Sequence, residues 1–183
     1  MPAPYTGGCQ CGAVRYEISA DPDAAYVCHC TDCQRQSGSA FAMAIRVPME
    51  HFRLLHGTLK KFMRRCDSGR SMDCLFCPEC GTRIYHVSER YPHYRSVKPG
   101  TLDDQRWNKP THHLFVRSKL PWVQIPAGVF AAEGMTPDLS WLGDRPGKGY
   151  IKIRAKADPH RSSGALLDWP DCDPQSGGSQ YRF

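Results

Sequence analysis

The alternation of apolar and polar residues along the chain predicts short strands rather than long helices. Apolar side chains recur at every second position from Gly12 to Ile18 and again from Ser39 to Val47, which is the period of a strand with one buried face. Gly57 separates two of the runs that follow, and we expect those two to form a hairpin. Residues 34–38 are the segment in which we expect a turn of helix. The remaining strands are expected at 52–55, 58–63, 71–76, 82–87, 94–98 and 112–116.

A series of about eight short strands with turn signals between them predicts a mainly β fold. We expect residues 5–136 to form one domain, a sandwich of short antiparallel strands. From residue 137 the composition changes to Gly, Pro, Ser and Asp, and only Tyr150 to Arg154 has the pattern of a strand. We therefore interpret residues 137–183 as an extension that wraps the surface or is partly disordered.

The composition limits the classes of partner and the compartment. The chain has 183 residues and a net charge of +6, from 24 Lys and Arg against 18 Asp and Glu. No run of basic residues concentrates this excess, so we do not expect nucleic acid as a partner, whereas small acidic substrates suit the charge. No segment approaches the length of a membrane span, and residues 1–6 lack the apolar part of an export signal. The expected location is the cytoplasm, where thiols stay reduced.

Ten cysteines are a high count for this length, and their close spacing predicts metal sites rather than disulfides. Two motifs match each other: Gly8-Cys9-Gln10-Cys11-Gly12 and Cys77-Pro78-Glu79-Cys80-Gly81. Such a turn can direct backbone N–H groups at the sulfurs, and the glycine permits the positive φ that the turn requires. We predict a closed structural zinc site that pins the first strand to the middle of the sheet. Its ligands are Cys9, Cys11, Cys77 and Cys80.

A second set of thiols lies in Cys28-His29-Cys30-Thr31-Asp32-Cys33. One short loop can supply three thiolates to a soft metal ion and leave its fourth position free. We predict a second zinc, with a catalytic role, on Cys28, Cys30 and Cys33, which makes two zinc ions per chain. A zinc with three thiolate ligands is suited to bind and activate another thiol, or to polarise a small carbonyl.

Three other cysteines are candidates for the fourth ligand of that loop: Cys66, Cys74 and Cys172. Cys74 precedes Cys77 by three residues, so a rival pairing of these two stays open. In an extended strand their side chains would point to opposite faces. We interpret all three as ordinary packed or exposed cysteines, which leaves the fourth position of the zinc to water or a substrate atom.

Taken in order, the motifs resemble the glutathione-dependent formaldehyde-activating (GFA) family, which includes centromere protein V. The resemblance covers about residues 5 to 125 and begins at Gly8 to Tyr16, in the first cysteine motif. It continues through both other cysteine motifs. Further matches are Ser37-Gly38-Ser39-Ala40-Phe41, Gly100-Thr101-Leu102-Asp103-Asp104, Pro110-Thr111-His112-His113 and Ser118-Lys119-Leu120-Pro121-Trp122.

The resemblance implies a β-tent fold, which is shared with methionine-R-sulfoxide reductases, and the same division of metals. Structural zinc would lie on the four-cysteine set and catalytic zinc on Cys28, Cys30 and Cys33. The family activity is that of a carbon–sulfur lyase, S-(hydroxymethyl)glutathione synthase, which implies glutathione as the thiol partner and formaldehyde as the aldehyde.

Several single residues near these motifs carry an expectation. We expect His29 to face solvent between its two cysteine neighbours, and a proton carrier in the metal pocket is the alternative. Three basic residues are expected at the surface, although each could meet a carboxylate of glutathione: Arg35, Lys98 and Lys119. Surface or structural roles are expected for Asp103, Asp104, His112 and His113, and a place in the core or a pocket wall for Phe41 and Trp122.

These observations favour an enzyme that acts on the adduct of a thiol and a small aldehyde. Two alternatives stay open from the residues alone. One is a binding module in which both zinc ions are structural, with a modest basic group at Lys60, Lys61, Arg64, Arg65 and Arg70. The other is a sensor that releases zinc when the three exposed thiolates are oxidised.

Overall fold

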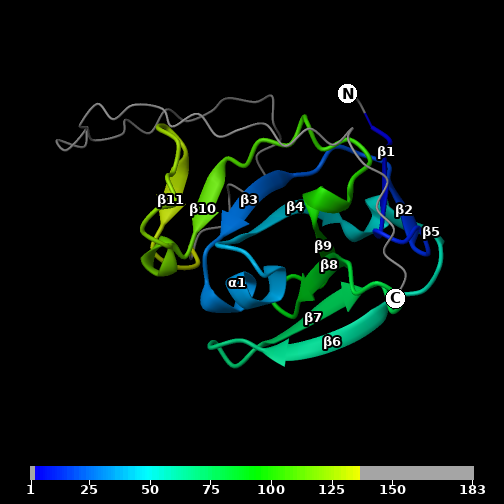
Figure 1. Ribbon diagram of the computed structural model, residues 1–183, viewed down its shortest axis with the longest axis horizontal. Helices are drawn as coiled ribbons and strands as arrows, with labels where there is room; N and C mark the ends of the chain where they lie inside the picture. Colours follow the sequence, from blue (N-terminus) through cyan, green and yellow to red (C-terminus); the bar gives the residue numbers. More distant parts are fainter. Residues whose placement is uncertain (1–2, 137–183) are drawn as a thin grey trace, which may run out of the picture. The chain divides into compact units, whose positions relative to one another are not determined.

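The computed structural model describes residues 3–136, which form two β-sheets, one α-helix and three short 3-10 helices (Figure 1). The smaller sheet is antiparallel, with the strand order β1-β2-β5. Its strands are β1 (Tyr5–Gly8), β2 (Arg15–Ile18) and β5 (Phe52–His56). The predicted extension from residue 137, with its strand at 150–154 and Cys172, lies outside the described residues.

The larger sheet has eight strands in the order β11-β10-β3-β4-β9-β8-β7-β6. All its pairings are antiparallel except at one edge, where β10 runs parallel to both β3 and β11. The mainly β fold is therefore confirmed, and the departure from the predicted antiparallel pairing is confined to this edge. The strands are β3 (Ala24–Cys28), β4 (Ala42–Pro48), β6 (Lys60–Arg65), β7 (Ser71–Phe76), β8 (Arg83–Ser88), β9 (Tyr94–Val97), β10 (His112–Leu114) and β11 (Phe130–Ala132).

Helix α1 (Thr31–Ser37) follows β3 after two residues and begins earlier than the predicted turn at 34–38. The reason is its cap: the Cys30 backbone is extended, and its sulfur accepts a hydrogen bond from the N–H of Cys33 at 3.4 Å. That is the role that Ser or Asp usually has at this position. Gly38 ends the helix with a φ of 60°. The 3-10 helices are η1 (Met49–His51), η2 (Pro99–Thr101) and η3 (Val116–Ser118).

The core lies between the small sheet and one face of the large sheet. The register places Ile45 of β4 beside Val97 of β9, and both side chains are fully buried in one cluster with Tyr16 and Ile18 of β2. Burial of side chains of this size contributes roughly 1.5–3 kcal/mol each. The two sheets are thus joined by apolar packing where their central strands meet.

The opposite face of the large sheet is polar and is covered in part by α1. The register places Ser96 of β9 beside His86 of β8, and His86 beside Cys74 of β7. The Gln36 amide of α1 donates a hydrogen bond to the Cys74 sulfur at 3.3 Å. Ser96, His86 and Cys74 therefore lie on the side of the sheet that α1 covers.

Each of the eight predicted strands has a counterpart, but the predicted hairpin at Gly57 is wrong. Strand β5 pairs with β2 in the small sheet, and β6 pairs with β7 in the large sheet. Gly57 instead carries the chain from one sheet to the other with a φ of 81°. A Cβ at this residue would collide with the carbonyl group of Ala13, so the crossing requires glycine.

Three strands were not expected from the sequence: β1, β3 and β11. Strand β1 includes Gly7, which lies against the Tyr16 side chain so closely that a Cβ would not fit. Strand β3 consists of apolar residues without a period of two, because none of them is exposed on either face of the sheet. Within residues 3–136, no helix has the length and apolar character needed to cross a membrane.

Candidate functional site

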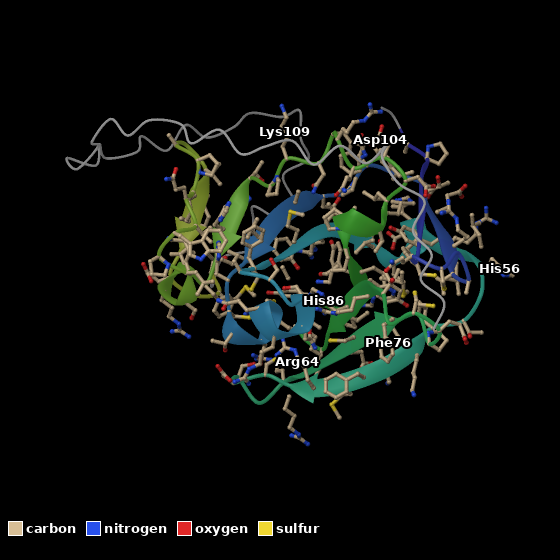
Figure 2. The ribbon with its side chains drawn as sticks, in the orientation of Figure 1. His56, Arg64, Phe76, His86, Asp104 and Lys109 are labelled. Atoms are coloured by element: carbon tan, nitrogen blue, oxygen red, sulfur yellow. The ribbon has the colours of Figure 1, made fainter. Side chains whose placement is uncertain are left out.

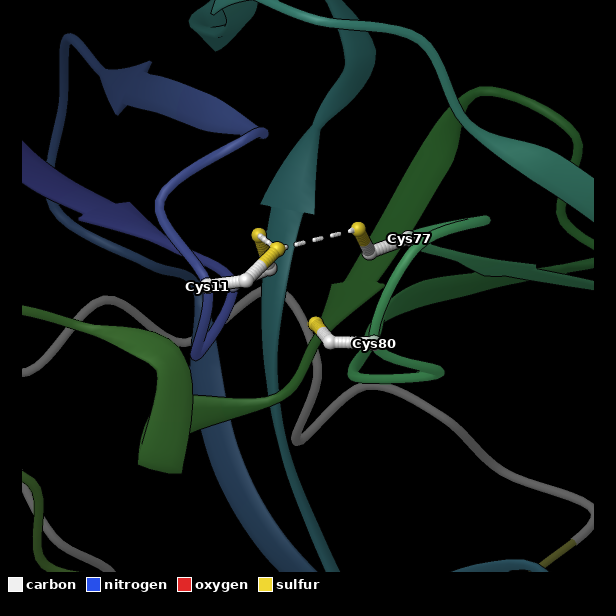
Figure 3. A group of neighbouring side chains, drawn as sticks. Cys11, Cys77 and Cys80 are labelled. Carbon is white, nitrogen blue, oxygen red and sulfur yellow. Dashed lines mark hydrogen bonds between the residues drawn. The ribbon is translucent and has the colours of Figure 1, made fainter. Parts of the chain in front are cut away.

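The structure brings Cys9, Cys11, Cys77 and Cys80 together, and their sulfurs all lie within 4.8 Å of one another (Figure 3). The Cys11 sulfur is 3.4 Å from that of Cys9 and 3.8 Å from that of Cys77. Cys9 and Cys77 are buried, whereas Cys11 is exposed. The first pair follows β1 of the small sheet and the second follows β7 of the large sheet, so the group joins the two sheets.

The first pair lies in a turn that glycine makes possible. The N–H of Cys9 donates to the carbonyl of Val14 at 3.0 Å, and the N–H of Gly12 donates to the carbonyl of Cys9 at 3.2 Å. Gly12 has a φ of 78°. The same turn directs the N–H of Val14 at the Cys9 sulfur at 3.2 Å, which stabilises a thiolate there.

The second pair lies in a turn of the same design. The N–H of Cys77 donates to the carbonyl of Thr82 at 2.9 Å, the N–H of Gly81 donates to the carbonyl of Cys77 at 3.0 Å, and Gly81 has a φ of 72°. The Thr82 hydroxyl lies 3.1 Å from the Cys80 sulfur and accepts from the N–H of Gln10 at 3.2 Å, so it bridges the two turns. The Thr82 hydroxyl and nearby N–H groups lower the pKa of the Cys80 thiol to about 5.

The second group is Cys28, Cys30 and Cys33, whose sulfurs also lie within 4.8 Å of one another. Cys28 ends β3, Cys30 caps α1 and Cys33 lies in its first turn. Hydrogen bonds from the two neighbouring thiols hold the pKa of Cys30 far below its usual value, while the pKa of Cys28 is raised. Without metal the three sulfurs thus share protons, and a cation replaces those protons when it binds.

Both groups fit zinc by the chemistry of their donors. Four sulfurs within 4.8 Å of one another suit a closed tetrahedral site, and three suit a site with one open position. Within residues 3–136 no fourth Cys, His, Asp or Glu joins the three-cysteine group. Cys66 and Cys74 belong to neither group, so the rival pairing of Cys74 with Cys77 is wrong.

His29 does not face solvent as expected; its side chain is fully buried. Its Nε2 lies 2.9 Å from Nδ1 of His113 on β10, and its ring meets Phe41 edge to face with centroids 5.5 Å apart. Burial is the main cause that lowers the pKa of His29, and the neighbouring His113 adds to it. The Gln34 amide donates to the His29 carbonyl at 2.7 Å. These contacts hold the His29 ring in one position, and they also hold the loop between Cys28 and Cys30 in place.

Lys98 also departs from expectation, because its side chain is half-buried and lines a cavity. Its Nζ is 3.1 Å from Nδ1 of His86, which Figure 2 labels beside α1. Desolvation, with nearby Arg83, lowers the pKa of Lys98 to about 8. Desolvation also holds the pKa of His86 well below its usual value, so this histidine is neutral and accepts a hydrogen bond from the ammonium.

The cavity beside Lys98 has a volume of about 440 Å³. Helix α1, the start of β4, β8 and η2 all contribute to its wall, and Phe41 and Arg83 line it together with Lys98. Sequence reasoning missed Arg83 and His86 as residues of the site. The available signal is indirect. In Ser96-Val97-Lys98, at the end of β9 and just beyond it, polar residues flank an apolar one, which is the pattern of a strand with a polar face, and His86 of β8 lies beside Ser96 on that face.

The remaining candidates have the expected roles, except Trp122. Asp103 accepts two hydrogen bonds from the Arg15 guanidinium and ties η2 to the small sheet. The Lys119 ammonium donates to two backbone carbonyls in its own loop, and Arg35 is exposed. Phe41 forms a pocket wall as expected, but Trp122 is 71% exposed and belongs to neither the core nor the pocket.

Comparison with known proteins agrees with the motifs. The family model described as glutathione-dependent formaldehyde-activating enzyme matches residues 4–118. A crystal structure of a Rhodobacter sphaeroides protein is similar at 24% sequence identity with a TM-score of 0.43, over 54% of this chain and 87% of that one. Because the family model spans more than half of the chain, from the first cysteine motif to η3, the protein belongs to the glutathione-dependent formaldehyde-activating (GFA) family.

Proposed function

We propose that the protein is a zinc-dependent carbon–sulfur lyase that acts on the adduct of a thiol and a small aldehyde. Glutathione is the proposed thiol and formaldehyde the proposed aldehyde, as in the name of the family. The observation that carries the proposal is the three-cysteine group, which has no fourth protein ligand among residues 3–136 and lies at the start of the helix whose far end lines a cavity.

Cys28, Cys30 and Cys33 would hold the catalytic zinc, and the four-cysteine group would hold a structural one. Zinc with an open position lowers the pKa of a thiol that binds there and presents it as a thiolate nucleophile. The protein supplies the geometry. The Cys30 cap holds the loop against the start of α1, and the contact between His29 and His113 holds it against β10.

In the forward direction the substrate sulfur forms a bond to the carbonyl carbon, and the electron pair of the C=O π bond moves to oxygen. That oxygen takes a proton to give the hydroxymethyl thioether, and the lyase direction is the reverse. The Lys98 ammonium in the cavity wall favours negative charge on the oxygen as it develops. The cavity holds thiol and aldehyde together, and this proximity contributes to the rate because no encounter in solution is then needed.

The test is the rate of exchange between formaldehyde and its glutathione adduct, followed by NMR with and without the protein. Cys30→Ser is the informative variant, because serine preserves the helix cap but is a poor zinc ligand. We expect it to lower the rate by roughly two orders of magnitude, in line with the loss of a metal that activates a nucleophile. Cys66→Ser is the matched control and should retain the rate. Full turnover by Cys30→Ser would contradict the mechanism.

The binding module with two structural zinc ions is less well supported by the described residues. Two of the five cations in the predicted basic group are paired with carboxylates: Lys61 with Asp73, and Arg64 with Asp32 of α1. Figure 2 shows Arg64 directly below the helix that carries Asp32. The remaining charge is small for a surface that binds nucleic acid, where many phosphate contacts determine affinity.

A further inference from the structure

Strand β6 forms one end of the large sheet and presents an open edge (Figure 1). It pairs with β7 alone, so its other side has no partner strand among residues 3–136. Alternate residues of such an edge direct their N–H and C=O groups outward, where another extended chain can pair with them. The register with β7 is continuous over Lys60–Arg65, and β6 contains no proline. Because β11 at the other end has only three residues, β6 is the long and regular edge of this sheet.

Both faces of β6 carry the same pattern of side chains. Phe62 lies opposite Cys74 in the register, and Cys74 contacts Gln36 of α1, so Phe62 is on the face that α1 covers in part. Alternation along the strand places Lys60, Phe62 and Arg64 on that face and Lys61, Met63 and Arg65 on the other. Each face therefore presents a cation, an apolar side chain and a second cation, in that order.

The two apolar side chains at the centre of this pattern are exposed. Phe62 is 55% exposed and Met63 is 50% exposed. Cations on an edge strand commonly prevent unwanted pairing, and this role alone would account for the charges. It does not account for an exposed Phe and Met between them, because apolar residues weaken such protection. The pattern instead suits a partner that covers the apolar pair and neutralises the cations.

Two of the four cations, Lys60 and Arg65, form no ion pair within residues 3–136. Hydrogen bonds from Ser71 hold the carboxylate of Glu89, and Arg65 acts on that carboxylate only from a distance. The other two cations are each paired with one carboxylate. Lys60 and Arg65 lie on opposite faces and at opposite ends of β6, so each face keeps one positive charge that is not neutralised.

A second copy of the chain would be a poor partner for this edge. If two β6 strands paired antiparallel with their apolar residues matched, Lys60 would lie opposite Arg65 of the other copy. Lys61 would likewise lie opposite Arg64, and a parallel pairing in register would place each cation opposite its own copy. Like charges directly opposite one another destabilise a strand pair. The edge thus disfavours self-association and suits a strand of the opposite charge.

We propose that β6 is a docking edge for an extended acidic segment of another protein, which adds a strand to the large sheet. The complementary order is two acidic residues, two apolar residues and two acidic residues. An antiparallel strand of this order places an acid opposite each cation and an apolar side chain opposite Phe62 and Met63. Hydrogen bonds along the open edge supply affinity, and the side chains supply specificity. The docking edge does not depend on the proposed lyase function.

The test uses the full-length, zinc-loaded protein and a fluorescein-labelled peptide, Gly-Ser-Glu-Glu-Val-Val-Glu-Glu-Ser-Gly, whose binding is followed by fluorescence anisotropy. A control peptide carries N-methyl groups on both valines, which leaves its charge unchanged. One of two adjacent residues always directs its N–H at the neighbouring strand, so this peptide loses a hydrogen bond in either register.

The variants are Lys60→Glu, Arg65→Glu and Phe62→Ser, with circular dichroism and zinc content to show that each is folded. Lys109→Glu is the matched control, because Lys109 is exposed and Figure 2 labels it on the opposite side of the view from Arg64.

We expect saturable binding that weakens with added salt, and binding of the N-methylated peptide that is weaker by roughly tenfold or more. Lys60→Glu and Arg65→Glu should each weaken binding roughly fivefold to tenfold, because a pair of opposite charges becomes a pair of like charges. Phe62→Ser should have an effect of about the same size through lost apolar contact. Lys109→Glu should leave the affinity within about twofold, since only long-range charge changes.

The proposal would be overturned if the acidic peptide did not bind saturably, or if the N-methylated peptide bound equally well. It would also be overturned if duplex DNA bound more tightly than the peptide and lost affinity in the same variants. A dimer of the native protein in sedimentation equilibrium that Phe62→Ser dissociates would assign the edge to a second copy instead. Turnover of glutathione and formaldehyde is measured separately, so loss of the lyase activity alone leaves the docking edge standing.

Discussion

The four-cysteine group and the three-cysteine group use the same donor atom but differ in how the chain brings the donors together. The first joins residues that are 66 apart in sequence, such as Cys11 and Cys77, and lies where the two sheets meet. The second is local, since Cys28 and Cys33 belong to one loop between β3 and α1. Cross-links between distant residues restrict the unfolded chain far more than local ones do. The first group therefore suits stability, and the second suits chemistry.

The difference also appears in what surrounds each group. The four-cysteine group packs into the apolar core, with Cys9 and Cys77 buried beside Val14 and Ile84. The three-cysteine group lies on the polar side of the large sheet, near Lys98 and its cavity. A closed metal in an apolar setting has nothing to react with, whereas an open metal beside a cavity has room for a substrate.

The largest expected effect is on stability, from Cys77→Ser. Loss of a ligand from the four-cysteine group removes a link that, by analogy with a disulfide closing a loop of 66 residues, contributes about 4 kcal/mol. We expect the free energy of unfolding to fall by at least that amount, with loss of one zinc equivalent. Urea denaturation and metal analysis measure the two quantities. Cys74→Ser is the matched control, because Cys74 is equally buried but in neither group, and it should cost only about 1–2 kcal/mol. Similar costs for both variants would remove the distinction.

The next effect concerns the stability of Cys30→Ser. This variant should also lose one zinc equivalent, yet the free energy of unfolding should fall by only about 1 kcal/mol, because the ligand set is local and serine retains the helix cap. The same denaturation series gives the value. A loss as large as that of Cys77→Ser would mean that the loop also holds the fold together, and the contrast between the groups would fail.

A smaller effect is the pH dependence of turnover. The pKa of Lys98 is lowered to about 8 by desolvation first and by Arg83 second, so the ammonium is present below pH 8 and lost above it. Because this ammonium favours negative charge on the reacting oxygen, catalysed turnover should fall as the pH rises through about 8, and Lys98→Arg should move this fall to higher pH. The free energy of unfolding changes in the opposite direction. In the unfolded chain Lys98 keeps its proton up to a pKa of about 10.4, so between about pH 8 and pH 10.4 the unfolded state binds more protons and the free energy of unfolding rises with pH. The NMR exchange assay at several pH values, repeated with Lys98→Met, isolates the group, because the transition should vanish in that variant.

The smallest effects on turnover come from two glycines with positive φ, one near each group. Gly12 follows the first cysteine pair with a φ of 78°, and Gly38 ends α1 with a φ of 60°. A Cβ at either residue meets no atom within 4 Å, so alanine should cost only the backbone term of about 1–2 kcal/mol. Gly12→Ala should leave turnover unchanged. Gly38→Ala should raise the KM for the thiol, because α1 lines the cavity; equal kinetics in both variants would argue that the helix end does not position substrate.

Much of this organisation could be predicted from local patterns. The paired motifs around Cys9 and Cys77 specify both the ligands and the turn, because each turn forms from hydrogen bonds between residues at most five apart. The period of two in β2 is equally local. Strand β3 could not be predicted this way, because its apolar residues gain their structure from β4 and β10 on either side. The passage of the chain from one sheet to the other at Gly57 was missed, because a glycine between two strands gives the same sequence pattern whether the strands pair with each other or belong to different sheets.

The sequence by itself determined the mainly β fold, the family, and the sets of cysteines suited to zinc, since these depend on spacing along the chain. Only the tertiary structure decided which sulfurs meet across the two sheets and that no fourth ligand among residues 3–136 reaches Cys28, Cys30 and Cys33. It also buried His29 and placed Lys98 in a cavity wall, against expectation. The physical reason is that burial and charge partners arise between elements distant in sequence, so a lone lysine or histidine has the same appearance on a surface strand as in a cavity wall.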